Sequence, residues 1–229
     1  MLRALIFDVD GTLADTENLG HRRAFNEAFK EQGFDDEWSE QQYHSLLKVA
    51  GGKERLKHYW QSIGRPEAED TSLIDRLHQC KTKIYARLVQ AGEIKLRPGV
   101  ESVLAAARDR GLTLAIATTT TRSNVETLLR ARLGPNALDW FQVIACAEDA
   151  PNKKPAPDVY QLVLEKLKLP GGDVIVFEDN FNGLQAATAA GIDRVVITPT
   201  SFSQSEDFGD TWLVLEDLTQ FELGDYCNL

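Results

Sequence analysis

Short apolar runs alternate with helical patterns at the start of the chain and again from about residue 96 onward. Such runs, bounded by turn residues, predict buried β-strands, while apolar residues spaced three to four apart between them predict helices. The predicted strands cover residues 3–9, 112–119, 141–148, 173–179 and 194–199, with a possible edge strand in 212–218. The predicted helices cover residues 99–110, 123–133, 157–167 and 183–190. This alternation predicts an α/β fold with a parallel sheet that is covered on both faces.

Residues 17–95 have a different pattern. They are rich in charged and polar helix formers, and aromatic residues such as Phe25 and Phe29 are spaced for one helical face. This segment predicts four or five short helices and no strand. Because it follows the first strand directly, we expect an inserted α-helical domain within a core domain made of residues 1–16 and 96–229.

Composition narrows the possible partners. The chain has 229 residues, 43% of them hydrophobic, and a formal net charge of −10. An acidic chain is not attracted by nucleic acid or by an anionic membrane, so neither partner is expected. No apolar run reaches the roughly 20 residues of a membrane helix, and the N-terminus lacks a signal-peptide profile. The three cysteines form no Cys-x-x-Cys pair, so we expect reduced thiols in a cytoplasmic protein. A monomer is the default expectation for the oligomeric state.

Polar residues follow four of the predicted strands. They are Asp8 and Asp10, then Thr118, Thr119 and Thr120, then Lys154, and finally Glu178 and Asp179. In open α/β sheets, ligands bind beyond the carboxyl ends of the strands, so these side chains are expected to meet. The paired acids would repel one another, and a divalent cation together with Lys154 would offset that repulsion.

The chemistry of this set favours phosphoryl transfer. Four carboxylates suit Mg²⁺, and no His or Cys stands among them, which argues against zinc. Asp8 can act as a nucleophile towards phosphorus if the metal and Lys154 screen its charge. Asp10 can protonate the leaving oxygen and later activate water. Hydroxyl and backbone N–H groups at Thr118, Thr119 and Thr120 can hold phosphate oxygens.

Each signal alone also has a simpler structural interpretation. Asp-x-Asp-Gly fits a turn with side-chain hydrogen bonds, and the threonines fit a helix cap. Lys154 alone fits a solvated lysine, and Glu178-Asp179 fits a solvent-facing turn. All four signals, in this order at successive strand ends, favour a functional site.

The motifs FDVDGTLADT, the threonine after LAIA, KKPAPDVY and FEDNFNG resemble the four motifs of the haloacid dehalogenase superfamily of phosphohydrolases. The resemblance implies the Rossmann-like core of that fold, with residues 17–95 as its helical cap. It also implies Asp8 as nucleophile, Asp10 as general acid and base, and Thr118 and Lys154 as motif residues. Metal ligation would come from Asp8, from the backbone carbonyl of Asp10, and from Glu178 and Asp179. Asn180 departs from the serine found in many relatives, with a minor effect expected.

Three further segments, GHRRAFNEAF, VAGGKERL and ATTTTRSNVE, are similar to the CbbY group, which is associated with carbon fixation in the Calvin cycle. That resemblance implies hydrolysis of xylulose 1,5-bisphosphate, an inhibitor of Rubisco, to xylulose 5-phosphate. Gly20 is an added residue relative to the group's commoner spacing, and it is expected to shift His21 along its helix.

The helical segment holds the candidate residues for the rest of the substrate. Gly51 and Gly52 start a helix that carries Lys53 and Arg55, and N–H groups at a positive helix end make an anion site. This combination suits a second phosphate. Residues that can contact sugar hydroxyls or lie near the nucleophile are Glu17, His21 and Tyr43. Each also fits ordinary packing or a solvated surface.

The sequence therefore predicts a Mg²⁺-dependent phosphatase for a small phosphorylated sugar. A phosphomutase similar to β-phosphoglucomutase and a phosphoglycolate phosphatase remain alternatives, as does a non-enzymatic sensor on the same fold.

Overall fold

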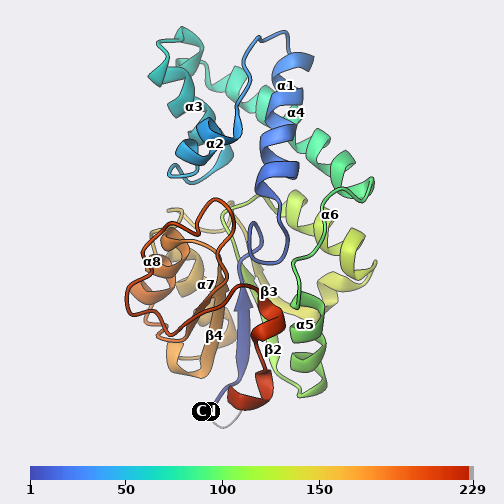
Figure 1. The fold of residues 1–229 in the computed structure, drawn as a ribbon, viewed down its shortest axis with the longest axis vertical. Helices are drawn as coiled ribbons and strands as arrows, with labels where there is room; N and C mark the ends of the chain where they lie inside the picture. Colours follow the sequence, from blue (N-terminus) through green and yellow to red (C-terminus); the bar gives the residue numbers. More distant parts are fainter. Residues whose placement is uncertain (227–229) are drawn as a thin grey trace. The chain divides into compact units, whose positions relative to one another are not determined.

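The structure is a computed structural model that describes residues 1–226, and the chain divides into two units (Figure 1). The core consists of Met1–Asp15 and the described chain from Lys95 onward. The helical unit consists of Thr16–Ile94. The helical unit is thus one continuous insertion into the core. The chain leaves the core at Asp15, after the first strand, and returns to it at Lys95.

The core contains a six-stranded sheet in the order β3-β2-β1-β4-β5-β6, and every neighbouring pair is parallel. The strands are β1 (Ala4–Phe7), β2 (Thr113–Ala117), β3 (Phe141–Ala145), β4 (Val174–Glu178), β5 (Val195–Ile197) and β6 (Leu213–Val214). The predicted α/β fold is confirmed, including the edge strand in 212–218. Because all strands run the same way, their carboxyl ends share one edge of the sheet, where a ligand is expected.

Helices cover the sheet as the apolar pattern requires. They are α5 (Val100–Asp109), α6 (Arg122–Leu133), α7 (Asp158–Leu167) and α8 (Phe181–Ala189). Ala4 and Ile6 of the central strand belong to one apolar cluster with residues of α7 and α8. Phe7 stacks on Phe177 with ring centroids 4.6 Å apart, and Phe177 also contacts Phe221. The two central strands, β1 and β4, are buried along their whole length, which explains their apolar sequences.

The helical unit contains no strand among its residues, all of which the structure describes. Its elements are a π-helix (Glu17–Arg22), α1 (Arg23–Glu31), α2 (Glu40–Leu46), α3 (Gly52–Ser62), a 3₁₀ turn (Pro66–Glu69) and α4 (Thr71–Gln90). The expectation of short helices is wrong for α4, which has 20 residues. Asp70 caps its start by accepting a hydrogen bond from the N–H of Leu73 at 2.9 Å, and no glycine interrupts it before Gly92.

Within residues 1–226, no helix combines the length and the apolar character needed to cross a membrane.

Candidate active site

Asp8 follows β1 directly and is almost fully buried. The residue is 6% exposed, and its N–H donates to the carbonyl of Phe177 on the neighbouring strand at 3.0 Å. The strand pairing therefore fixes the backbone at this position. A carboxylate in such a place loses hydration and needs a cation close by.

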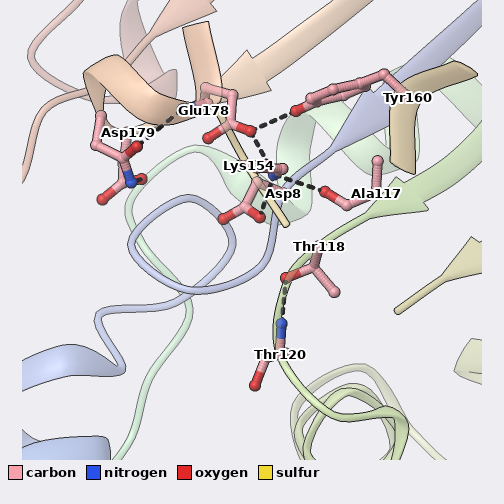
Figure 2. Close-up of polar contacts among 10 residues, drawn as sticks. Asp8, Ala117, Thr118, Thr120, Lys154, Tyr160, Glu178 and Asp179 are labelled. Atoms are coloured by element: carbon pink, nitrogen blue, oxygen red, sulfur yellow. Dashed lines mark hydrogen bonds and ion pairs between the residues drawn. The ribbon is translucent and has the colours of Figure 1, made fainter. Parts of the chain in front are cut away.

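Lys154 provides that cation and joins three strand ends (Figure 2). Its Nζ donates to Asp8 Oδ1 at 2.7 Å, to the Ala117 carbonyl at 2.9 Å and to Glu178 Oε1 at 2.5 Å. These acceptors come from the ends of β1, β2 and β4, and the lysine is only 5% exposed. All three ammonium protons are used, so the lysine is held in one position.

Burial and charge set the protonation of this pair. Burial raises the pKa of Asp8 to about 8, with Lys154 acting in the opposite direction and Glu178 adding to the rise. Burial alone would lower the pKa of Lys154, but Asp8 and Glu178 raise it above its ordinary value. Lys154 is therefore charged at neutral pH. Further positive charge beside Asp8 would hold this carboxylate ionised as well.

Three acids at the sheet edge fit a divalent cation. Asp8, Glu178 and Asp179 each offer an oxygen, and these oxygens lie within 4.8 Å of one another. Glu178 Oε2 is buried and has no hydrogen-bond partner, which is costly unless something positive meets it. Carboxylate oxygens are the ligands that Mg²⁺ prefers. The residues present therefore suit the cation that the sequence predicts.

Two glycines make room for these acids. Gly11 has φ +84°, and a Cβ there would lie 2.1 Å from Asp179 Oδ2. A Cβ at Gly183 would lie 2.0 Å from Glu178 Oε2. Both positions therefore require glycine, for reasons that the strand and helix patterns do not reveal.

Asp10 lies in the turn that follows Asp8 and is half-buried. The turn closes through hydrogen bonds from Gly11 N–H to the Ala14 carbonyl at 2.8 Å and from Leu13 N–H to the Val9 carbonyl at 3.0 Å. These hydrogen bonds restrain the backbone of the turn. Asp10, two residues after Asp8, is therefore held in a defined position.

Tyr160 also belongs to the buried cluster around Lys154, although the sequence pattern did not predict it as a site residue. Its hydroxyl donates to Glu178 Oε1, the same oxygen that Lys154 contacts, and the side chain is fully buried. The residue lies inside the KKPAPDVY motif on the inward side of α7, six positions after Lys154. A buried tyrosine within a motif is the signal that could have identified it, because its hydroxyl must find a partner.

The threonines form a polar loop at the end of β2. Thr118 is 2% exposed, and its hydroxyl accepts a hydrogen bond from the N–H of Thr120 at 3.3 Å. The hydroxyl proton of Thr118 can still be donated to an anion. Thr119 and Thr120 are half-buried, and Asn124 donates to Thr120 Oγ1 at 3.3 Å.

Asn180 serves as the N-cap of α8. Its Oδ1 accepts from the Gly183 N–H at 3.0 Å, and its Nδ2 donates to Asp179 Oδ1 at 2.6 Å. Asparagine therefore caps the helix in the way serine can and also holds one of the acids.

Three of the candidate residues in the helical unit form one hydrogen-bonded chain. Tyr43 donates to Glu17 Oε2 at 2.6 Å, and Arg55 Nη1 donates to the Tyr43 hydroxyl at 2.9 Å. The Arg55 guanidinium also lies over the Tyr43 ring and donates to the Leu46 carbonyl at 3.2 Å. Arg55 is 7% exposed, so this cation is held inside the unit.

Lys53 lies differently, although it is only two residues away. It is half exposed, and its Nζ lies 2.6 Å from Asp75 on α4. Gly51 has φ +92° at the start of α3, and a Cβ on Gly52 would lie 2.8 Å from His78. The glycine turn is thus required by backbone shape and packing, and the two cations that follow it point to different surroundings.

His21 lies in the π-helix, together with Gly20. The His21 N–H donates to the Thr16 carbonyl at 2.7 Å, five residues earlier, as a one-residue insertion into a helix produces. Its Nδ1 lies 3.0 Å from Nζ of Lys81, a lysine that is 3% exposed. Because an ammonium only donates, this contact requires an imidazole that accepts at Nδ1.

Lys81 was also missed in the sequence analysis. It falls on the apolar face of α4, four residues from Leu77 and from Tyr85. A lysine inside an apolar stripe is the signal that could have identified it.

Comparisons with known proteins identify the family of the chain. Residues 2–191 match a family model described as haloacid dehalogenase-like hydrolase. The chain is 52% identical to the CbbY protein of Cupriavidus necator over 95% of this chain and 86% of that protein. It is 31% identical to a phosphorylated carbohydrates phosphatase of Thermotoga maritima, with 85% of this chain and 84% of that protein covered.

A solved structure of a mutant CbbY from Rhodobacter sphaeroides in complex with xylulose-(1,5)bisphosphate is similar throughout. Its TM-score is 0.88 at 39% identity, with 96% of each chain covered. By sequence and by fold, then, the chain belongs to the haloacid dehalogenase-like hydrolases and to their CbbY-like group, and it is a phosphoric monoester hydrolase.

Proposed function

We propose that the chain is a Mg²⁺-dependent phosphatase that hydrolyses xylulose 1,5-bisphosphate to xylulose 5-phosphate and phosphate. The observation that carries this proposal is the buried cluster of Asp8, Lys154 and Glu178, with Asp179 beside it. Bringing these charges together in the folded core is costly, and a phosphoryl-transfer site gives a reason for it.

In the first step, an oxygen of Asp8 attacks phosphorus while the bond from phosphorus to the sugar oxygen breaks. Asp10 donates its proton to the departing oxygen, so that the sugar leaves as an alcohol. Lys154 holds Asp8 and stabilises the added negative charge. Mg²⁺ held by the carboxylates of Asp8, Glu178 and Asp179 and by the backbone carbonyl of Asp10 would supply the remaining positive charge.

In the second step, Asp10 takes a proton from water, which attacks the phosphorus of the aspartyl-phosphate. The bond to Asp8 breaks, phosphate leaves, and both carboxyl groups return to their starting states. Thr118 donates to a phosphoryl oxygen, assisted by N–H groups at Thr119 and Thr120.

We propose the helical unit, residues 17–95, as a cap that binds the rest of the substrate. Arg55 is a buried cation in a chain with Tyr43 and Glu17, a combination that suits a phosphate and sugar hydroxyls. His21 and the glycine turn at Gly51 and Gly52 add polar groups, whereas Lys53 contributes charge from an exposed position. The bisphosphate named for the Rhodobacter sphaeroides structure has the two anionic ends that such a site requires.

The setting follows from the same proposal. A Rubisco inhibitor is removed where carbon is fixed, so we expect a cytoplasmic enzyme linked to the Calvin cycle. We also propose that it acts as a monomer, with a small phosphorylated sugar as its partner.

The test is phosphate release with Mg²⁺ from a panel of substrates. The panel contains xylulose 1,5-bisphosphate, ribulose 1,5-bisphosphate, β-glucose 1-phosphate, 2-phosphoglycolate and fructose 1,6-bisphosphate. We expect preference for the xylulose compound and a loss of about 10³-fold or more in Asp8→Asn. The matched control, Asp109→Asn, removes an exposed carboxylate at the end of α5 and should leave the rate unchanged.

Other outcomes would redirect the proposal. Formation of glucose 6-phosphate from β-glucose 1-phosphate would identify a mutase, and preference for 2-phosphoglycolate would identify a phosphoglycolate phosphatase. Activity that survives in Asp8→Asn would contradict the nucleophile.

A further inference from the structure

Arg97 binds backbone carbonyls from three separate segments of the core. Its Nη1 donates to the carbonyls of Gly11 and Thr198, and to Thr198 Oγ1 at 3.0 Å. Its Nη2 donates to the carbonyls of Pro199 at 3.0 Å and Glu216 at 3.4 Å. These acceptors follow β1, β5 and β6. One half-buried side chain therefore connects the carboxyl ends of three strands.

The same residue holds the turn that carries Asp10 at two points. Its backbone N–H donates to the Leu13 carbonyl at 2.9 Å, and its side chain donates to the Gly11 carbonyl. Leu13 in turn donates to Val9 at 3.0 Å across the base of the turn. Both halves of this turn are therefore tied to Arg97.

Gly11 is restrained from its other side as well. Its Cα lies so close to Asp179 that an added Cβ would be 2.1 Å from Oδ2. Gly11 is thus held by the guanidinium of Arg97 at its carbonyl and by the Asp179 carboxylate at its Cα. Any displacement of Gly11 moves Asp10, its neighbour in the chain.

Arginine suits this position better than other residues. A guanidinium presents five donors in a fixed plane, so it can serve carbonyls that lie in different directions. A lysine at this position would be shorter than arginine, and its charge and donors would be concentrated on a single nitrogen. An apolar side chain of similar length would leave the carbonyls of Gly11, Thr198 and Pro199 without this donor.

We propose that Arg97 is a positioning residue that aligns Asp10 for proton transfer to the leaving sugar oxygen. This inference rests on the proposed function, in which Asp10 is the general acid. Arg97 acts through the backbone of the turn and does not touch the reacting atoms.

The experiment compares two leaving groups in Arg97→Met and Arg97→Lys. A sugar phosphate leaves as an alkoxide and needs a proton, whereas p-nitrophenyl phosphate leaves as a stable phenolate and does not. We expect kcat/KM for the sugar bisphosphate to fall about 10- to 100-fold in Arg97→Met, and that for p-nitrophenyl phosphate by less than about 3-fold. The kcat/KM of Arg97→Lys for the sugar bisphosphate should lie between those of Arg97→Met and the wild type. If Arg97→Met does not fold, Arg97→Lys alone provides the comparison between the two substrates.

A second measurement repeats the substitution in an Asp10→Asn background. If Arg97 acts through Asp10, Arg97→Met adds no further loss with the sugar bisphosphate there. The matched control is Arg194→Met, which changes a half-buried arginine just before β5, at the opposite end of that strand from Thr198. The ratio of its kcat/KM values for the sugar bisphosphate and for p-nitrophenyl phosphate should equal that of the wild type.

Equal losses for both substrates, or an undiminished loss in the Asp10→Asn background, would show that Arg97 only stabilises the fold. These results differ from failure of the proposed function. In that case the wild-type protein itself would release no phosphate from the sugar bisphosphate, or its phosphate release would survive in Asp8→Asn.

Discussion

At the scale of single residues, the two oxygens of the Glu178 carboxylate have different surroundings. Its Oε1 accepts from Lys154 and from Tyr160, while its Oε2 is buried and has no hydrogen-bond partner. The two donors fix the rotation of the carboxylate, so that the remaining oxygen is free to accept a metal.

Tyr160→Phe should therefore weaken Mg²⁺ binding about 10-fold, because the carboxylate of Glu178 loses one of its two fixed donors. The measurement is a calorimetric titration of the protein with Mg²⁺, which needs no substrate. Tyr59→Phe is the matched control, since this buried tyrosine also donates to a carboxylate, Asp36, at 3.0 Å, but lies in the helical unit. Equal Mg²⁺ affinity in Tyr160→Phe and the wild type would contradict the role given to Tyr160.

At the scale of elements, the first turn of α8 limits the space beside the acids. Gly183 lies in this turn, next to the cap formed by Asn180. In most helices a glycine costs up to about 1 kcal/mol relative to alanine, so alanine would be expected to stabilise the protein. Here the Cβ would lie 2.0 Å from Glu178 Oε2, and the helix must keep its glycine.

We expect Gly183→Ala to lower both the free energy of unfolding and the affinity for Mg²⁺. The loss of stability should be about 1–3 kcal/mol, the usual range for inserting a methyl group into a filled space. Urea denaturation, with and without Mg²⁺, measures both quantities. Gly172→Ala is the control, because an added Cβ there meets nothing within 4 Å. A stabilised Gly183→Ala protein would show that α8 can shift away from the acids.

At the scale of the whole molecule, the acidic cluster links stability to pH. Without metal, burial raises the pKa of Asp8 from its ordinary 3.8 to about 8. The folded protein then holds a proton that the unfolded chain releases above about pH 4. Stability therefore falls as the pH rises from about 4 to about 8, and Mg²⁺ should reduce this fall by keeping Asp8 ionised in the folded state.

The measurement is the free energy of unfolding in urea across that pH range, in EDTA and in Mg²⁺. Asp8→Asn supplies the reference, because its amide does not titrate and the difference from the wild type isolates this group. A wild-type protein in EDTA with the same pH dependence as Asp8→Asn would contradict the prediction.

Much of this molecule follows from its sequence because strand periodicity and strand-end residues are local signals. The five buried strands and the polar residues at their ends, from Asp8 to Asp179, could be predicted in this way. The partners of Tyr160 and Arg97 could not, since each side chain reaches groups at or beyond the ends of strands that are distant in sequence. Packing between α4 and the π-helix, which brings Lys81 to His21, is likewise a tertiary effect.

The chain passes from the core to the helical unit after Asp15 and returns to the core at Lys95. The position of these two connections bears on how the helical unit could be exchanged. Ala14 and Leu96 form an antiparallel bridge within the core, two residues from each end of the insertion. The chain thus departs and re-enters through adjacent residues, as is usual where domain insertion is tolerated. A short turn could close the core there, and a helical unit of another length could be spliced in its place. If the helical unit binds the substrate as proposed, selectivity for new phosphate esters can change by exchange of this whole unit, while Asp8 and the turn that follows it stay intact.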